Sequence, residues 1–207
     1  MEKQVNKAIH ILKKGGIVAY PTDTVYGLGA NALDEAAVLR VYAAKRRPHH
    51  LAVPILLASI SQIDEVARDV PGIAWSLAER FLPGGLTLVL YKSPAIPDVV
   101  TGGDNKIAVR VPAHPIPIAL IEGIGAPITG TSANLSGNPN PVTAEEVSRQ
   151  LGDRIDLIID GGRCQGDVAS TVIDLTGEYP LILREGVVSR YDIEKVCRLP
   201  VRSGKEA

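Results

Sequence analysis

The order in which helical and extended patterns follow one another is the feature that most restricts the fold of this chain. Apolar residues recur at helical spacing from Val5 to Leu12, stop at Gly15 and Gly16, and give way to a β-rich run that ends at Tyr20. Helix and strand patterns then alternate, whereas the last third carries three short strand patterns in quick succession. This order predicts an α/β fold around a twisted mixed sheet flanked by helices, rather than a purely parallel doubly wound sheet.

The same patterns place the remaining elements. Asp34 and Thr143 are candidate helix caps. Predicted helices span 35–45, 63–67, 73–81, 116–121 and 144–151, with a last one from about Tyr191. Predicted strands span 52–57, 86–91, 107–111, 156–160, 170–175 and 180–184. Because the sequence has no repeat, low-complexity segment or interdomain linker, we expect one domain over residues 1–200 and a flexible tail over 201–207.

Size and charge limit the function classes. With 207 residues, 45% of them hydrophobic, the chain can bury one sizeable core. Its net charge of -1 gives no general attraction to nucleic acids or membranes, so such binding needs a local patch. Cys164 and Cys197 are too few for a disulfide framework. The N-terminus is charged and amphipathic, and no apolar run approaches the ~20 residues of a membrane span. We therefore expect a soluble, cytoplasmic protein without a membrane partner.

The segment PTDTVYGLG, residues 21–29, places two threonines and an aspartate directly after a predicted strand. Open α/β sheets tend to bind ligands at the carboxyl ends of their strands, which makes Thr22 and Thr24 candidate ligand contacts. The alternative is a strand-to-loop turn, in which Pro21 and Asp23 set the backbone and the threonines cap it. The segment alone does not separate these interpretations.

The segment KRRPHH, residues 45–50, gathers cations at the end of a predicted helix. Cations there are favoured by the helix dipole and usually remain solvated. The alternative is a phosphate clamp, because Arg47 offers a planar fork to phosphoryl oxygens and Lys45 a compact charge.

Two later loops repeat the hydroxyl-rich character of the first. GTSANLSGNPNP, residues 130–141, and DGGRCQGDVAST, residues 160–171, offer short donors and acceptors beside predicted strands, although each can be an ordinary polar loop. Three such loops in one domain favour a binding site. A Walker A motif and a G-x-G-x-x-G fingerprint are absent, and the four histidines lack metal-site or triad spacing. This argues against a zinc enzyme or a nucleophilic enzyme, and we expect no metal caged by the protein.

Together these segments resemble the YrdC/Sua5 family, the threonylcarbamoyl-AMP synthases of tRNA threonylcarbamoyladenosine formation. The resemblance covers roughly Lys7 to Arg190. It rests on separate motifs in the family's order: PTDTVYGLGANA, the KxRP of Lys45 to Pro48, FLPGGLTLVL, VTGGDNKIAVRVP, SANLSG, STVID and the LREG of Leu183 to Gly186. Longer members carry an extra C-terminal domain, and this chain resembles a short form without it.

The resemblance implies a YrdC-like fold with a concave basic cleft, and an activity. L-Threonine, bicarbonate or CO2, and ATP would give L-threonylcarbamoyladenylate and pyrophosphate, for the t6A37 modification of tRNA. The substrates supply the nucleophiles, so the protein mainly positions them and neutralises charge. Mg2+ would arrive with ATP. Further implied partners are tRNA or the transferase machinery that uses the adenylate.

The resemblance also implies roles for individual residues. Threonine would be held by Thr24, Arg110, Ser132 and Ser170, with the arginine suited to its carboxylate. Thr22 is a further candidate whose role is not separable from that of Thr24. ATP would be faced by a second set, with the cations on its phosphates: Lys45, Arg47, Lys106, Asn134 and Arg184.

Three positions depart from the family's pattern. HHLAVP follows the KxRP motif and puts Leu51 where relatives have other residues. Leu56 stands where some relatives carry a threonine-contacting histidine, and Lys106 stands where threonine is common.

Two other functions stay open. One is a double-stranded RNA or tRNA-binding module using the same cleft, which would show steep salt dependence and no ATP turnover. The other is a different carbamoyl-transfer enzyme, which usually carries further domains and zinc-finger cysteines.

Overall fold

The computed structural model describes residues 1–166 and 168–204. Its helices are α1 (Glu2–Lys13), α2 (Glu35–Lys45), α3 (Ile63–Val66), α4 (Gly72–Phe81), α5 (Asp98–Thr101), α6 (Pro115–Ile124), α7 (Ala144–Leu151) and α8 (Arg190–Cys197), with short 3-10 helices at Ile60–Gln62 and Gly152–Arg154. Its strands are β1 (Val18–Tyr20), β2 (Gly27–Gly29), β3 (Ile55–Leu56), β4 (Ala67–Arg68), β5 (Leu86–Lys92), β6 (Lys106–Arg110), β7 (Ile128–Thr129), β8 (Thr131–Ser132), β9 (Leu157–Ile158), β10 (Thr171–Asp174), β11 (Leu181–Arg184) and β12 (Arg202–Ser203).

In the described part of the chain the strands form two mixed sheets. The larger sheet has the order β12-β11-β10-β5-β6-β3-β7, and β4 pairs with β5 beside this path. Parallel and antiparallel pairs alternate along it. The smaller sheet has the order β8-β2-β1-β9. The predicted α/β class with mixed strand pairing is therefore confirmed.

The smaller sheet includes strands that the sequence analysis had assigned to loops. β2 lies inside the PTDTVYGLG segment and pairs with β1 on one side and with β8 of the GTSAN segment on the other. Glycine is a poor strand former, and it occupies two positions of β2 because a larger residue would not fit there. A Cβ on Gly27 would lie 2.8 Å from a ring carbon of Tyr20, and one on Gly29 would lie 2.6 Å from another. The two glycines therefore let the buried Tyr20 ring lie against β2.

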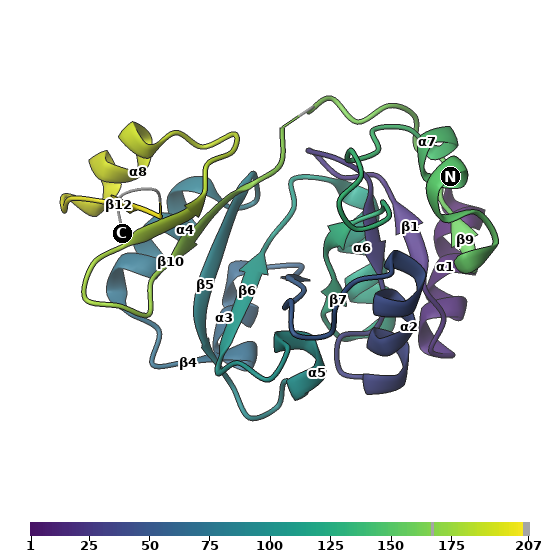
Figure 1. The fold of residues 1–207 in the computed structure, drawn as a ribbon, viewed down its shortest axis with the longest axis horizontal. Helices are drawn as coiled ribbons and strands as arrows, with labels where there is room; N and C mark the ends of the chain where they lie inside the picture. Colours follow the sequence, from purple (N-terminus) through teal and green to yellow (C-terminus); the bar gives the residue numbers. More distant parts are fainter. Residues whose placement is uncertain (167, 205–207) are drawn as a thin grey trace.

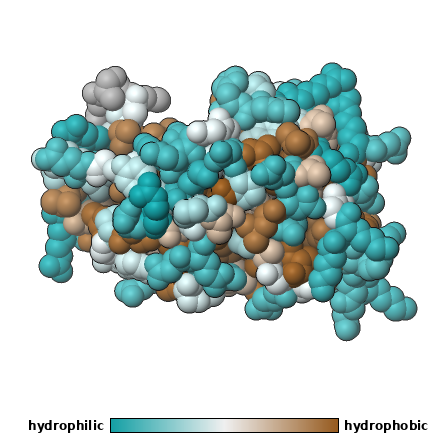
Figure 2. All heavy atoms as spheres, turned by 90° about the horizontal axis from the view of Figure 1, so that it is seen from below, coloured by the Kyte–Doolittle hydropathy of each residue, from teal (hydrophilic) through white to brown (hydrophobic). Residues whose placement is uncertain are grey.

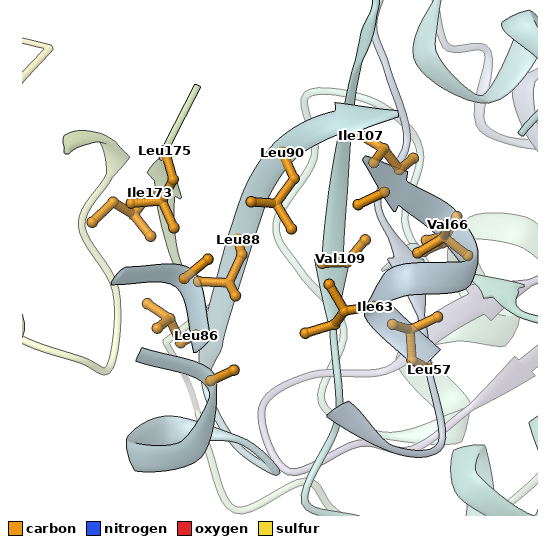
Figure 3. Close-up of a cluster of buried hydrophobic side chains, with 14 of the residues drawn as sticks. Leu57, Ile63, Val66, Leu86, Leu88, Leu90, Ile107, Val109, Ile173 and Leu175 are labelled. Carbon is orange, nitrogen blue, oxygen red and sulfur yellow. The ribbon is translucent and has the colours of Figure 1, made fainter. Parts of the chain in front are cut away.

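The core of the larger sheet follows the period-two alternation of its strands. Leu86, Leu88 and Leu90 alternate along β5 and are all buried. Figure 3 shows these side chains in one cluster with apolar side chains from β6 and β10. Helices α4 and α8 pack against one another and contribute to the same cluster. One face of β5, β6 and β10 is thus core, which leaves the other face for different contacts.

The remaining helices are distributed over the other parts of the fold. α1 packs on α6, and both contribute with β1 to a second cluster, while α2 and α7 contribute to a third cluster with β1 and β2. Figure 1 shows α1, α7 and β9 at one end of the molecule and α8 with β12 at the other.

Most predicted elements are confirmed, with changes at their ends. The strand predicted over 52–57 is reduced to Ile55–Leu56, and the one predicted over 156–160 to Leu157–Ile158. Val201 is fully buried and Arg202–Ser203 pair with β11, so this part of the expected tail takes part in the fold. Residues 205–207 of that tail lie outside the described residues, and the division into one domain and a tail stays a prediction.

The surface is mixed in character. On the face seen in Figure 2, hydrophobic residues lie in several patches separated by hydrophilic ones. None of the helices described here combines the length and the apolar character that crossing a membrane requires.

Candidate active site

A cavity of about 480 Å³ lies on the face of β5, β6 and β10 that is turned away from the leucine core. Because side chains alternate along a strand, Thr87 of β5, Arg110 of β6 and Asp174 of β10 line the cavity while their neighbours are buried in the core. The loops after β1, after α2 and after β7 close its other sides. Its volume lies in the range of about 300–1,000 Å³ that is usual for small-molecule sites.

The four residues predicted to hold threonine all lie on this wall. Thr24 follows β1, Arg110 ends β6, Ser132 belongs to β8 and Ser170 precedes β10. The fold thus brings together side chains from four separate segments of the sequence. Their roles toward a ligand remain predictions.

Arg110 is fixed by three hydrogen bonds, one from each guanidinium nitrogen. Nε donates to the main-chain oxygen of Gly84 at 2.8 Å, Nη1 to Oγ1 of Thr24 at 3.0 Å, and Nη2 to Oδ1 of Asp23 at 2.6 Å. The Arg110 side chain is only 8% exposed. A guanidinium carries five N–H donors, so three bonds hold the group without using all of its donors.

Ser170 lies at a second junction of polar groups. Its Oγ is 2.8 Å from Oγ1 of Thr87, and Nη2 of Arg184 donates to its main-chain oxygen at 2.9 Å and to its Oγ at 3.2 Å. Burial lowers the pKa of Arg184, and the nearby Arg110 lowers it further. Two arginines therefore lie close enough on one wall to repel each other, an arrangement that an anionic ligand would stabilise.

Arg47 and Lys106, predicted to face ATP, also line the cavity. Arg47 follows α2 and is held by its own loop, since Nε donates to Leu51 O at 3.0 Å and Nη2 to Ala52 O at 2.8 Å. Burial lowers the pKa of Arg47. Lys106 forms an ion pair of 2.9 Å with Asp174, and this hydrogen bond raises the pKa of the lysine.

Lys45 and Asn134, from the same predicted set, do not lie on the cavity wall. Lys45 is 1% exposed, and its Nζ donates to the main-chain oxygens of Ser132 and Asn134 and to Oδ1 of Asn134. Burial, with a smaller contribution from Arg47, lowers the pKa of Lys45 to about 7. As a correction to the sequence analysis, Lys45 is not a solvated helix-end cation, because it is buried and holds the segment that carries Ser132. Its contact with ATP stays a prediction.

Thr22 is likewise behind the wall. Its Oγ1 lies 3.0 Å from Oγ1 of Thr24 and donates to Val25 O at 2.7 Å. The structure thus separates the two threonines: Thr24 reaches the cavity and Thr22 supports the turn.

The sequence analysis missed two polar residues at the site. The sequence analysis considered Asp23 only as a residue that sets the backbone of a turn, whereas its carboxylate is paired with Arg110. Thr87 shares a hydrogen bond with Ser170. Their partners lie more than eighty positions away along the chain, so no local pattern could indicate them.

The charges of the wall are mixed. Its described residues include four basic side chains and two acidic ones, namely Arg47, Lys106, Arg110, Arg184, Asp104 and Asp174. Within residues 1–166 and 168–204, His, Cys, Asp and Glu do not form a group of three that could hold a metal ion.

Fold and cavity together define an α/β protein with a cavity on one face of a mixed sheet, whose hydroxyls and arginines are suited to a small polar ligand with anionic groups. The chain belongs to the Sua5/YciO/YrdC family, whose model, described as "Telomere recombination", matches residues 10–186.

Relatives and solved structures extend this match. The chain is 48% identical over 195 residues to a threonylcarbamoyl-AMP synthase of Pyrococcus abyssi and 42% identical over 196 residues to one of Bacillus subtilis, covering 94% of this chain in both cases. It spans 57% of the length of each of these relatives. The crystal structure of P. abyssi Sua5 complexed with L-threonine superposes with a TM-score of 0.94 at 47% identity, over 98% of this chain and 59% of the other.

Proposed function

We propose that this chain is an L-threonylcarbamoyladenylate synthase, which forms threonylcarbamoyl-AMP and pyrophosphate from L-threonine, bicarbonate or CO2, and ATP. One observation carries the proposal. Thr24, Arg110, Ser132 and Ser170 converge on a single cavity with three further cations, in a chain that is similar to named synthases over 94% of its length.

The chemistry requires positioning and charge neutralisation more than a reactive side chain. The threonine amine takes up the one-carbon unit, one carbamate oxygen attacks the α-phosphorus of ATP, and pyrophosphate leaves. We assign the threonine carboxylate to Arg110 and its hydroxyl to the nearby threonine and serine hydroxyls. Arg47, Lys106 and Arg184 lie on the same wall and would neutralise the phosphates.

Lys45 and Asn134 take an indirect part in this proposal. Both hold the segment of Ser132 from behind the wall, so they would order the ATP and threonine sites without touching a phosphate in the conformation described. Mg2+ would enter as part of the ATP substrate, bound through phosphates and water. The adenylate would be passed to a t6A transferase that acts on tRNA, and we propose that this occurs in the cytoplasm.

The test is a direct assay. We expect protein incubated with ATP, Mg2+, bicarbonate and labelled threonine to release pyrophosphate and to form a labelled threonylcarbamoyl adduct. Omission of threonine or chelation of Mg2+ should abolish both products. Absence of both products in the complete mixture, combined with salt-sensitive RNA binding, would favour the RNA-binding alternative. Stoichiometric zinc that turnover requires would contradict the role given to Mg2+.

A further inference from the structure

The carboxylate of Asp23 contacts Arg110 but has no part in the proposed reaction. Oδ1 of Asp23 accepts from Nη2 of Arg110 at 2.6 Å, the shortest of the three bonds that hold this guanidinium. We propose that Asp23 is a positioning residue, which fixes Arg110 in the orientation that receives the carboxylate of the amino-acid substrate. This inference rests on the proposed function and deepens it.

The burial of the pair makes the orientation matter. The Arg110 side chain is 8% exposed and that of Asp23 19% exposed, so neither charge is solvated as it would be on the surface. Removing one partner of such a pair leaves a poorly solvated charge behind. Asp23 also supplies the negative charge beside Arg110, which otherwise lies near the second arginine, Arg184.

The other two bonds cannot replace the one from Asp23. Gly84 accepts from Nε and Thr24 from Nη1, whereas Asp23 alone accepts from Nη2 among the bonds described. Gly84 lies before β5, and Asp23 and Thr24 follow β1, so the guanidinium is held between two segments. Loss of Asp23 leaves Nη2 without its acceptor and lets the plane of the group turn.

The experiment compares Asp23→Ala with Asp23→Asn. Asparagine keeps an oxygen acceptor at nearly the same place but loses the charge. We expect Asp23→Ala to raise the KM and Kd for threonine about ten- to hundredfold, the range for a lost bond to a charged group. ATP affinity should change by less than about twofold, and Asp23→Asn should recover part of the loss.

A double-mutant cycle tests whether Asp23 acts through Arg110. In an Arg110→Ala background, Asp23→Ala should cause no further loss of threonine affinity. Asp156→Asn is the matched control, because Asp156 also pairs with an arginine at 2.9 Å, but this arginine, Arg40, does not line the cavity as Arg110 does. It should leave the affinity for threonine unchanged.

Several results would overturn the positioning role. These are unchanged or tighter threonine binding by Asp23→Ala, equal losses for threonine and ATP, or additive losses in the double mutant. If Asp23→Ala does not fold, the comparison uses Asp23→Asn. We then expect a several-fold loss of threonine affinity with little change in ATP affinity, and the absence of this selective loss would contradict the role. Threonine binding by the wild type separates the two proposals: if the wild type binds threonine and forms the adenylate while the Asp23 variants match it, only the positioning role fails. If the wild type binds no threonine, the proposed function fails and the positioning role with it.

Discussion

Nζ of Lys45 donates to both oxygens of Asn134, to the main-chain oxygen at 2.8 Å and to Oδ1 at 3.2 Å. A further bond ends on the main-chain oxygen of Ser132, whose Oγ donates to Oδ1 of the same asparagine at 2.5 Å. Ser132 lines the cavity and Lys45 does not. The lysine therefore stabilises the position of one cavity residue from inside the protein.

The first prediction concerns the stability that Lys45 provides. Lys45→Met keeps the volume of the side chain but removes the donor from the main-chain oxygens of Ser132 and Asn134, while Oδ1 of Asn134 keeps its hydrogen bond from Ser132. We expect the free energy of unfolding to fall by about 1–3 kcal/mol at alkaline pH, the cost of unsatisfied buried polar groups. Urea unfolding of the wild type and the variant measures this. A variant as stable as the wild type at alkaline pH would contradict the role.

The pH dependence of the free energy of unfolding in the same two proteins provides a further test. The pKa of Lys45 is lowered to about 7 in the folded state, against about 10.4 in an unfolded chain. Between these values the unfolded state binds more protons, so this group's contribution to the free energy of unfolding rises with pH and is lost as pH falls toward 7. The wild-type value minus the variant value should increase between about pH 7 and about pH 9, by at most about 1.4 kcal/mol per unit. A constant difference would show that Lys45 does not titrate there.

The second prediction compares two neighbouring arginines. Arg47 lines the cavity, whereas Arg46 is the C-cap that follows α2, is exposed and does not contribute to the wall. We expect Arg47→Gln to reduce the rate of pyrophosphate release about a hundredfold or more, because a preorganised cation is lost from the developing charge. Arg46→Gln should remain near the wild-type rate. Equal rates for the two variants would mean that Arg47 is a helix-end cation without a part in the reaction.

The fold was largely predictable because its core obeys local periodicity. The alternation along β5 and β6 is visible in the sequence, and it separates core from cavity residues once the strands are placed. The smaller sheet was not predictable, since β2 consists of Gly27, Leu28 and Gly29. That strand is held by its pairing with β1 and β8, and its two glycines leave room for the ring of Tyr20, both of which are tertiary effects.

The sequence predicted which residues line the site better than it predicted the hydrogen bonds that these residues form. The family motifs pointed to Thr24, Arg110, Ser132 and Ser170, and the fold brings all four to one wall. A lysine at a helix end is usually solvated, however, and the burial of Lys45 depends on carbonyls that lie 87 and 89 positions away. Long-range partners of this kind leave no local pattern.

The third prediction tests how the cavity is divided between the two substrates. We expect Arg110→Ala to weaken threonine binding by about 1.5–3 kcal/mol, with a smaller effect on ATP, because its guanidinium would pair with the carboxylate. Arg184→Ala should weaken ATP binding more than threonine binding. Its bonds to Ser170 would still produce a small secondary loss for threonine. Calorimetric titration of each ligand into each variant measures the four changes, and equal losses throughout would mean that the division is wrong.

The last prediction concerns the choice of amino acid, which should depend on paired polar contacts. Ser170 and Thr87 share a hydrogen bond at the wall, and Thr24 and Ser132 add two more hydroxyls. Serine lacks one methyl group, which is worth about 1–3 kcal/mol in a fitted pocket, so its kcat/KM should fall roughly ten- to two-hundredfold below that of threonine.

Valine should be a still poorer substrate. It keeps the shape of threonine but has no hydroxyl, so a buried polar partner would lose its hydrogen bond, and unsatisfied groups of this kind are penalised more heavily than a missing methyl group. Pyrophosphate release with threonine, serine and valine at matched concentrations gives the ranking, and Ser170→Ala gives the control. In that variant the advantage of threonine over valine should shrink while the advantage of threonine over serine persists. Valine turning over faster than serine in the wild type would show that shape, rather than hydrogen bonding, determines the choice.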